Sequence, residues 1–242
     1  MIEVGPEDRV FVLTGAGISA ESGISTFRDS DGLWNGIRFE EVATPEAWRR
    51  NPKQVWEFYS MRRKAAADKK PNPAHVALAQ LEAALGDRLL ICTQNVDDLH
   101  EQAGSTRVLH MHGNLFQSRC GSCGRPPFDD RKTYEEELPK CLACGGQVRP
   151  HICWFGEVPF HLDRIFRELE FCTIFVAIGT SGVVHPAAGF VAQAKLKGYV
   201  RTCCYVGLEE PANRILFQQV VLGNAGEILP GLFQYSGAKS RS

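Results

Sequence analysis

Two Cys-x-x-Cys pairs carry the most specific chemical signal in this sequence. They are Cys120 with Cys123 and Cys141 with Cys144, and residues 124–140 separate them. Two such pairs at this spacing are typical of a zinc site with four thiolate ligands. Four protein ligands fill a tetrahedral shell and leave no position for water. The pattern therefore predicts one structural Zn²⁺ rather than a catalytic one.

A glycine-rich turn follows the apolar run 9–14. Gly15, Ala16, Gly17 and Ala20 fit the G-x-G-x-x-A form of the dinucleotide fingerprint, in which glycines let backbone N–H groups approach a pyrophosphate. The same glycines could instead serve only to connect a strand to a helix. Residues 21–28 add a second glycine turn, an aromatic residue and an arginine, which predicts a loop that folds over the cofactor.

Polar side chains follow another apolar run, 88–93. Gln94, Asn95 and Asp97 come directly after it, and amide and carboxylate groups at a strand end can hold ribose hydroxyls and a carboxamide. Asn95 and Asp97 could instead cap a helix over 98–103. Small hydrogen-bonding residues end the run 173–178 in the same way: Gly179, Thr180 and Ser181.

Two histidines, His110 and His112, close the apolar run 108–111. A neutral imidazole is the natural general base near pH 7, although a lone histidine is more often structural. Strand alternation would place both side chains on the same side. Periodicity therefore does not choose between them.

A parallel sheet would bring these residues together. Continuous apolar runs at 9–14, 88–93, 108–111, 173–178 and 200–206 are typical of strands covered on both faces. Helical patterns lie between them, most clearly at 73–85 and 186–197. This alternation predicts an α/β fold, a Rossmann-like doubly wound parallel sheet that binds its ligand at the carboxyl ends of the strands.

The cysteine segment breaks the alternation. Residues 119–148 hold both cysteine pairs and show little periodicity, so we expect a small inserted zinc-binding module stabilised by its metal. Residues 1–118 and 149–235 then form the Rossmann-like domain, and 236–242 a flexible tail.

Composition is typical of a freely diffusing protein. The 27 basic residues nearly balance 28 acidic ones, which argues against a dedicated nucleic-acid binder. The amino terminus lacks the features of a secretory signal, and no run is long enough to span a bilayer. We expect a cytoplasmic monomer with no membrane partner and no specific nucleic acid.

Taken together and in order, these motifs resemble the sirtuin family. The resemblance rests on Gly15-Ala16-Gly17-Ile18-Ser19, Ser22-Gly23-Ile24, Phe27-Arg28, Thr93-Gln94-Asn95-Val96-Asp97, His112-Gly113, the cysteine pairs and Gly179-Thr180-Ser181. It covers residues 10–230 and implies a bacterial-type NAD-dependent protein-lysine deacylase with one structural zinc. The implied reaction transfers the acyl group of an acylated lysine in a protein or peptide to ADP-ribose and releases nicotinamide.

The resemblance also implies roles for individual residues. His112 would be the general base, Asn95 would order ribose and water, and Asp97 would hold the nicotinamide amide. His110 would then be structural. The implied NAD-binding set is Gly15, Ala16, Gly17, Ala20, Thr26, Phe27, Arg28, Gln94, Asn95, Asp97, Gly179, Thr180, Ser181, Gly207, Leu208, Glu209 and Ala225.

Two further features follow from the same resemblance. An acylated peptide would add as a strand between Phe155-Gly156-Glu157 and Gly182-Val183-Val184. Gly207 departs from the family pattern, because many sirtuins carry there an asparagine that contacts the adenosine ribose. Only backbone contacts can be carried over at that position.

Three residues predict the acyl group. Tyr59 and Arg62 lie three residues apart in a helix expected over 52–67, so both can face one pocket. They resemble the pair of the sirtuin branch that removes malonyl and succinyl groups, since arginine offers a bidentate fork and tyrosine a hydroxyl donor to a carboxylate. Ala43 matches the small residue of that branch and would leave room for a longer chain than acetyl. The alternative places Arg62 on a solvated basic face with Arg63 and Lys64.

Two other functions fit parts of the pattern. A mono-ADP-ribosyltransferase would use the same NAD pocket with a protein nucleophile in place of the acyl oxygen. A non-catalytic NAD-sensing or zinc-ribbon protein would bind nucleic acid with a steep salt dependence. Release of O-acyl-ADP-ribose would identify the deacylase.

Overall fold

A six-stranded parallel sheet forms the centre of the protein, in the order β12-β11-β10-β2-β5-β6. The computed structural model describes residues 1–25, 33–34 and 37–235 of the chain. The strands are β2 (Val10–Thr14), β5 (Leu89–Thr93), β6 (Val108–His110), β10 (Ile174–Ile178), β11 (Thr202–Gly207) and β12 (Gln219–Leu222). The predicted doubly wound sheet is confirmed, and each predicted strand lies where its apolar run is.

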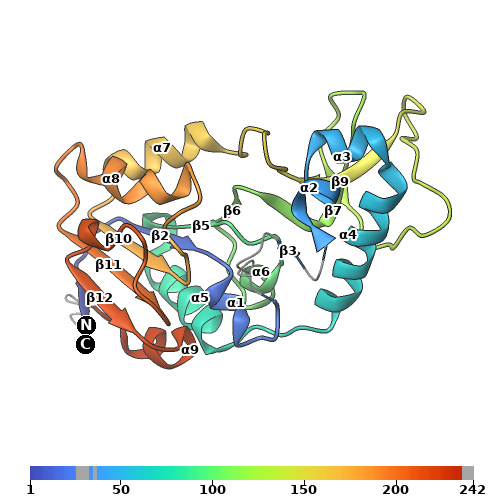
Figure 1. Ribbon diagram of the computed structural model, residues 1–242. Helices are drawn as coiled ribbons and strands as arrows, with labels where there is room; N and C mark the ends of the chain where they lie inside the picture. The colour runs from blue at the N-terminus through green and yellow to red at the C-terminus, as the bar shows by residue number, and fades with distance from the viewer. Residues whose placement is uncertain (26–32, 35–36, 236–242) are drawn as a thin grey trace.

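Helices cover both faces of this sheet, which explains why β2, β5 and β10 are buried along their whole length. Alternate residues of β2 enter different cores: Val10 and Val12 belong to one apolar cluster, Phe11 and Leu13 to the other. Figure 1 shows the two helical layers on either side of the strands. The first is α1 (Gly17–Ala20), α5 (Pro73–Leu85) and α9 (Ala225–Ile228), and the second α7 (Leu162–Phe171) and α8 (Phe190–Lys195).

The helix predicted over 73–85 is α5, with the predicted bounds. Pro73 occupies its first turn, and the Asn72 side chain accepts the backbone N–H of Ala74. The helix predicted over 186–197 is wrong at its start. A 3-10 turn, Ala187–Gly189, precedes α8, so Pro186 lies outside the α-helix.

The remaining elements are short. A parallel pair joins β1 (Ile2–Val4) to β13 (Phe233–Tyr235) beside the main sheet, and α6 (Leu99–Gln102) follows β5 within the predicted 98–103. The others are β3 (Leu33–Trp34), β4 (Ile37–Arg38) and the 3-10 helices Gly86–Arg88, Arg214–Leu216 and Leu229–Gly231. In the part of the chain that the structure describes, no helix combines the length and apolar character needed to cross a bilayer.

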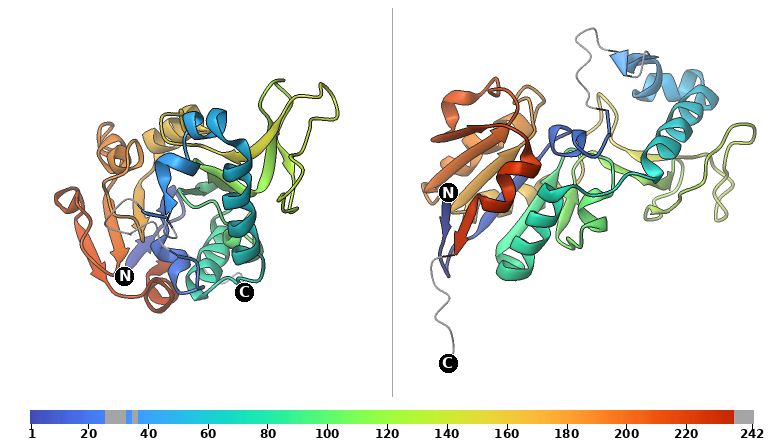
Figure 2. Two further views of the ribbon diagram at one scale, coloured as in Figure 1. Left: turned by 45° about the vertical axis from the view of Figure 1, so that its right-hand side comes forward. Right: turned by 90° about the horizontal axis from the view of Figure 1, so that it is seen from below.

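A second lobe stands beside the sheet (Figures 1 and 2). It holds the two Cys-x-x-Cys pairs. Its antiparallel sheet is β7 (Gly113–Cys120), β8 (Phe128–Asp129) and β9 (Val148–Ile152), and its helices are α2 (Phe39–Val42), α3 (Pro45–Arg50) and α4 (Pro52–Ala67). The helices pack on this sheet through a cluster that contains Phe58, Leu115 and Trp154. The lobe is therefore larger than the segment 119–148.

Arg63 ties α4 to this small sheet from the inside. Its side chain is 1% exposed and forms an ion pair with buried Asp130 at 3.2 Å. The guanidinium also donates to the backbone oxygens of Leu115, Gln117 and Lys132 at 2.7, 3.1 and 2.6 Å. A buried cation with this many acceptors is a structural group, so the solvated basic face considered for 62–64 does not exist at Arg63.

Arg63→Met should destabilise the small lobe strongly, because it leaves the Asp130 carboxylate buried without its cation. Loss of one partner of a buried pair typically costs about 3–5 kcal/mol. Lys64→Met is the matched control on the same helix, since Lys64 pairs with Glu135 at the exposed surface and such pairs contribute below about 1 kcal/mol. Urea unfolding followed by tryptophan fluorescence would compare them, and equal midpoints would contradict the structural role of Arg63.

Candidate active site

The glycine turn after β2 packs against the turn after β10. A Cβ on Gly15 would lie 2.8 Å from the carbonyl oxygen of Gly179, and one on Gly17 would lie 2.7 Å from the Cα of Gly179. The backbone N–H groups of Gly15 and Gly17 donate to the oxygens of Ile178 and Gly179, both at 2.9 Å. The glycines are therefore needed for the contact between the two turns.

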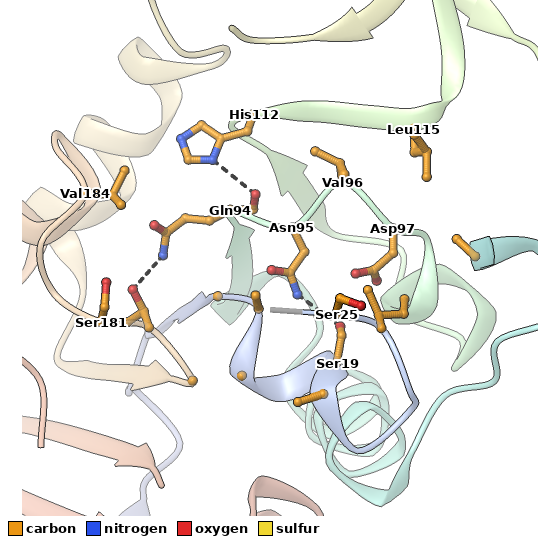
Figure 3. A pocket seen from close by; sticks show the side chains of 18 of the residues that line it. Ser19, Ser25, Gln94, Asn95, Val96, Asp97, His112, Leu115, Ser181 and Val184 are labelled. Carbon is orange, nitrogen blue, oxygen red and sulfur yellow. Dashed lines mark hydrogen bonds between the residues drawn. The ribbon is translucent and has the colours of Figure 1, made fainter. Parts of the chain in front are cut away.

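The polar residues after β5 reach toward this turn (Figure 3). Gln94 Nε2 donates to Thr180 Oγ1 at 2.9 Å, and Asn95 Nδ2 donates to Ser19 Oγ at 3.1 Å. Asp97 is buried, and burial raises the pKa of its carboxyl group. Neither Asn95 nor Asp97 is the N-cap residue of α6, which is Asp98. The Asp97 carboxylate does accept the N–H of Leu99, the first residue of that helix, at 3.2 Å.

Ser19 connects Asn95 to a buried histidine. The N–H of Asn72 donates to Nδ1 of His75 at 3.3 Å, so Nε2 carries the proton of the neutral ring and donates to Ser19 Oγ at 3.5 Å. Burial lowers the pKa of His75 to about 4, which keeps the ring neutral. The hydroxyl proton of Ser19 is then directed to Asp97, where the hydrogen bond partly offsets the effect of burial on the pKa of that carboxyl.

Sequence reasoning gave no role to Ser19 or His75. Ser19 lies in the glycine turn, but its type alone does not show which groups it joins. His75 belongs to a capping box at the start of α5, and that pattern indicates a helix start rather than a site.

The structure shows that His110 and His112 have different environments, which the periodicity of the sequence could not show. His110 lies between the backbone oxygen of Asn95 at 3.0 Å and the Glu101 carboxylate at 2.7 Å. Although burial acts in the opposite direction, the hydrogen bond and charge of Glu101 raise the pKa of His110. His110 is thus held by two acceptors, as a structural residue would be.

His112 presents the features of a general base. Its Nδ1 lies 3.1 Å from the backbone oxygen of Gln94, which can only accept, so Nδ1 carries the proton and Nε2 keeps its lone pair. Burial lowers the pKa of His112 despite this hydrogen bond. The imidazole is therefore neutral at pH 7 and faces the cavity described next (Figure 3).

A cavity of about 680 Å³ joins the two lobes. It runs from the carboxyl ends of β11 and β12, across the glycine turn, to α4 and the end of β9. The predicted residues that line it are Gly15, Ala16, Gly17, Ala20, Ala43, Tyr59, Arg62, Gln94, Asn95, Asp97, His112, Phe155, Gly156, Glu157, Gly179, Thr180, Ser181, Val184, Gly207, Leu208 and Ala225. Among the described residues, Gly182, Val183 and Glu209 are not part of the lining. Thr26, Phe27 and Arg28 lie outside the described residues, as does the tail 236–242.

Of the two segments predicted to hold a peptide, all of 155–157 and only Val184 of 182–184 line this cavity. Phe155 is 44% exposed and its backbone N–H donates to the oxygen of Ala43 at 3.0 Å. The Glu157 carboxylate accepts from Arg149 at 2.7 Å and from the backbone N–H of Trp154 at 2.9 Å. Glu157 therefore fixes its own turn, and its side chain is occupied by the protein.

The far end of the cavity is formed by α4. Tyr59 and Arg62 both line it, and Ala43 is 3% exposed beside them. The indole N–H of Trp154 donates to Tyr59 Oη at 3.0 Å, so the tyrosine hydroxyl proton can point elsewhere. Burial lowers the pKa of Arg62 only to about 10, so the guanidinium is a cation at pH 7.

The four cysteines of the pairs come together at the tip of the small lobe. Their Sγ atoms all lie within 4.8 Å of one another, with Cys120 to Cys144 at 3.5 Å and Cys123 to Cys141 at 3.8 Å. Tetrahedral Zn²⁺ with Zn–S bonds of about 2.3 Å requires sulfurs roughly 3.8 Å apart. The cluster thus fits a structural zinc ion.

Comparisons with known proteins agree with this geometry. Residues 15–186 match the Sir2 family. The chain is 50% identical over 227 residues to an NAD-dependent protein deacylase of Caulobacter vibrioides, covering 92% of this chain and 94% of the relative. It is 47% identical over 230 residues to one of Salmonella typhimurium, covering 94% and 84%. A crystal structure of a Sir2 homolog–NAD complex superposes with a TM-score of 0.84 at 42% identity, covering 93% of this chain and 88% of that one.

Cys141→Ser should lower the zinc content and the melting temperature of the small lobe, because structural zinc sites supply folding energy directly. Cys153→Ser is the control: it removes a cysteine that lies outside the cluster. Elemental analysis of the purified proteins would measure the metal. Wild-type protein without zinc would contradict the assignment.

Proposed function

The chain belongs to the Sir2 family, and we propose that it acts as an NAD-dependent protein-lysine deacylase that prefers acyl groups ending in a carboxylate. NAD dependence and deacylation rest on the family match and on relatives named for that activity. The observation that carries the acyl preference is the presence of Tyr59 and Arg62 in the same cavity as His112.

In the proposed arrangement the two halves of NAD lie on the two sides of the glycine turn. The pyrophosphate would lie at the turn formed by Gly15, Ala16 and Gly17, which lines the cavity and has no side chain larger than a methyl group at these three positions. The reactive ribose then lies toward Asn95 and His112, at the β5 side of the sheet. Asp97 sits beyond Asn95 and can accept a hydrogen bond from the nicotinamide amide.

His112 supplies the base in this arrangement. In the proposed reaction the acyl oxygen would first displace nicotinamide from the ribose. His112 Nε2 would then take a proton from a ribose hydroxyl, whose oxygen would bond to the acyl carbon as the lysine amine leaves. Asn95 orients the same ribose, and its amide is itself held by Ser19. His112 would thus transfer the proton, while Asn95 and Ser19 would position the ribose.

The acyl chain would extend from this centre toward α4. Arg62 offers a cation, and Tyr59 a hydroxyl whose oxygen already accepts the Trp154 indole N–H. A carboxylate between them would receive charge-assisted hydrogen bonds. The small side chain of Ala43 leaves room in the cavity for a malonyl or succinyl group, and the shorter acetyl group can also enter.

The other two functions have less support. Mono-ADP-ribosyl transfer would leave ADP-ribose on protein and has no use for Arg62 in the cavity. A zinc-ribbon nucleic-acid binder has no use for the cavity at all. We further propose that the protein acts in the cytoplasm as a monomer on acylated-lysine proteins, with the peptide held between 155–157 and 182–184.

His112→Ala should abolish acyl transfer while NAD binding and folding remain, since it removes a base and not a core group. Loss of a general base typically lowers turnover about 100- to 10,000-fold. Single-turnover assays with an acyl-lysine peptide, together with calorimetry of NAD binding, would measure both effects. Near-normal turnover in a folded variant would rule out this base.

The pH dependence has a definite sign. Because burial lowers the pKa of His112 below its ordinary 6.5, the neutral base persists as the pH falls to that value. The acidic limb of kcat/KM in wild-type protein should therefore lie below pH 6.5. A limb above pH 7 would contradict the neutral, buried imidazole.

Arg62→Met tests the acyl preference, because it removes the cation but keeps much of the apolar stem. A hydrogen bond to a charged group contributes about 1.5–3 kcal/mol, so kcat/KM on a succinyl-lysine peptide should fall roughly 10- to 100-fold or more. On the acetyl peptide it should change only a few fold, and Lys64→Met should change neither. Equal losses on both peptides would remove the proposed preference and leave the deacylase assignment intact.

A further inference from the structure

The last residue of β11, Gly207, has no room for a side chain. A Cβ there would lie 2.3 Å from the hydroxyl oxygen of Tyr205 and 2.8 Å from its Cζ. The backbone does not require glycine at this position, since Gly207 is absent from the glycines with positive φ. The tyrosine, and not the chain conformation, therefore excludes other residues.

Tyr205 is not free to move aside. It is 1% exposed, and its ring packs edge-on against buried Phe217 with centroids 5.7 Å apart. Its strand position is fixed by parallel pairing to Ala177 on one side and Val220 on the other. The hydroxyl is thus held at the carboxyl edge of the sheet, beside Gly207, where both residues line the cavity.

This edge of the cavity belongs to the adenosine half of NAD. The glycine turn follows β2, and the catalytic residues follow β5 and β6 on one side of it. Strand β11 lies on the other side, beyond β10. A dinucleotide with its pyrophosphate at the turn and its reactive ribose near Asn95 must direct its adenosine toward β11.

We propose that the Tyr205 hydroxyl binds the adenosine half of NAD, and that Gly207 is present because this hydroxyl occupies the space of its side chain. A tyrosine hydroxyl can both donate and accept, as a ribose diol or an adenine edge requires. Gly207 cannot make the side-chain contact to the adenosine ribose that an asparagine would make. In the proposed arrangement Tyr205 makes this contact instead, because it lies two residues earlier on the same face of the strand.

Tyr205→Phe removes the oxygen and keeps the ring in its packing. ADP-ribose binding measured by calorimetry should weaken about three- to tenfold, the usual effect of one neutral hydrogen bond. The KM for NAD should rise while kcat is unchanged. Tyr199→Phe, at a 59% exposed site outside the cavity, should bind ADP-ribose like wild-type protein.

A double-mutant cycle tests the second part of the proposal. Gly207→Ala should weaken ADP-ribose binding in the wild-type background, because the new methyl group and the Tyr205 hydroxyl cannot both keep their positions. The same change should cost less in the Tyr205→Phe background, so the two losses should not add. Melting temperatures show whether each variant is folded.

Two results would overturn the proposal. If Tyr205→Phe binds ADP-ribose within twofold of wild-type protein, the hydroxyl does not contact the ligand. If the losses from the two substitutions are additive, Tyr205 is not the reason for glycine at 207. Neither result depends on which acyl group the enzyme removes.

Discussion

The two turns that follow β2 and β10 touch through their backbones, and the site depends on this contact. Gly15 and Gly17 meet Gly179 so closely that a side chain on either turn would overlap the other. The wall of the cavity where these turns meet is therefore formed mainly by backbone and small side chains, which leaves room for a pyrophosphate. In the same cavity Asn95, after β5, lies on one side of these turns and Tyr205, on β11, lies on the other.

Much of the fold could be predicted because its signals are local. The buried strands are continuous apolar runs, and α5 has a proline in its first turn and leucines on one face. The zinc cluster could be predicted equally well, since the spacing of the cysteines within each pair is typical of this geometry. The start of α8 could not be read in this way: a 3-10 turn and an α-helical turn place apolar residues almost alike.

The site was harder to predict where a residue's role depends on a distant partner. His110 and His112 look equivalent in sequence, and they differ because Glu101 faces one and the cavity faces the other. Arg62 and Arg63 are also alike in type. Only the fold brings Asp130 to Arg63, which removes it from the surface. No local pattern could show that the Trp154 indole would reach Tyr59 across 95 residues.

Helix α4 joins two functions through adjacent residues. Successive positions of a helix point about 100° apart, so Arg62 faces the cavity while Arg63 enters the interior of the small lobe. A one-residue insertion upstream in α4 would turn Arg62 toward the interior of the lobe and leave Met61 facing the cavity. A one-residue deletion would turn Arg63 toward the cavity and Lys64 toward the interior. Replacing a single side chain on α4 can therefore change the cavity alone, whereas shifting the helix by one residue would change the cavity and the interior of the lobe together.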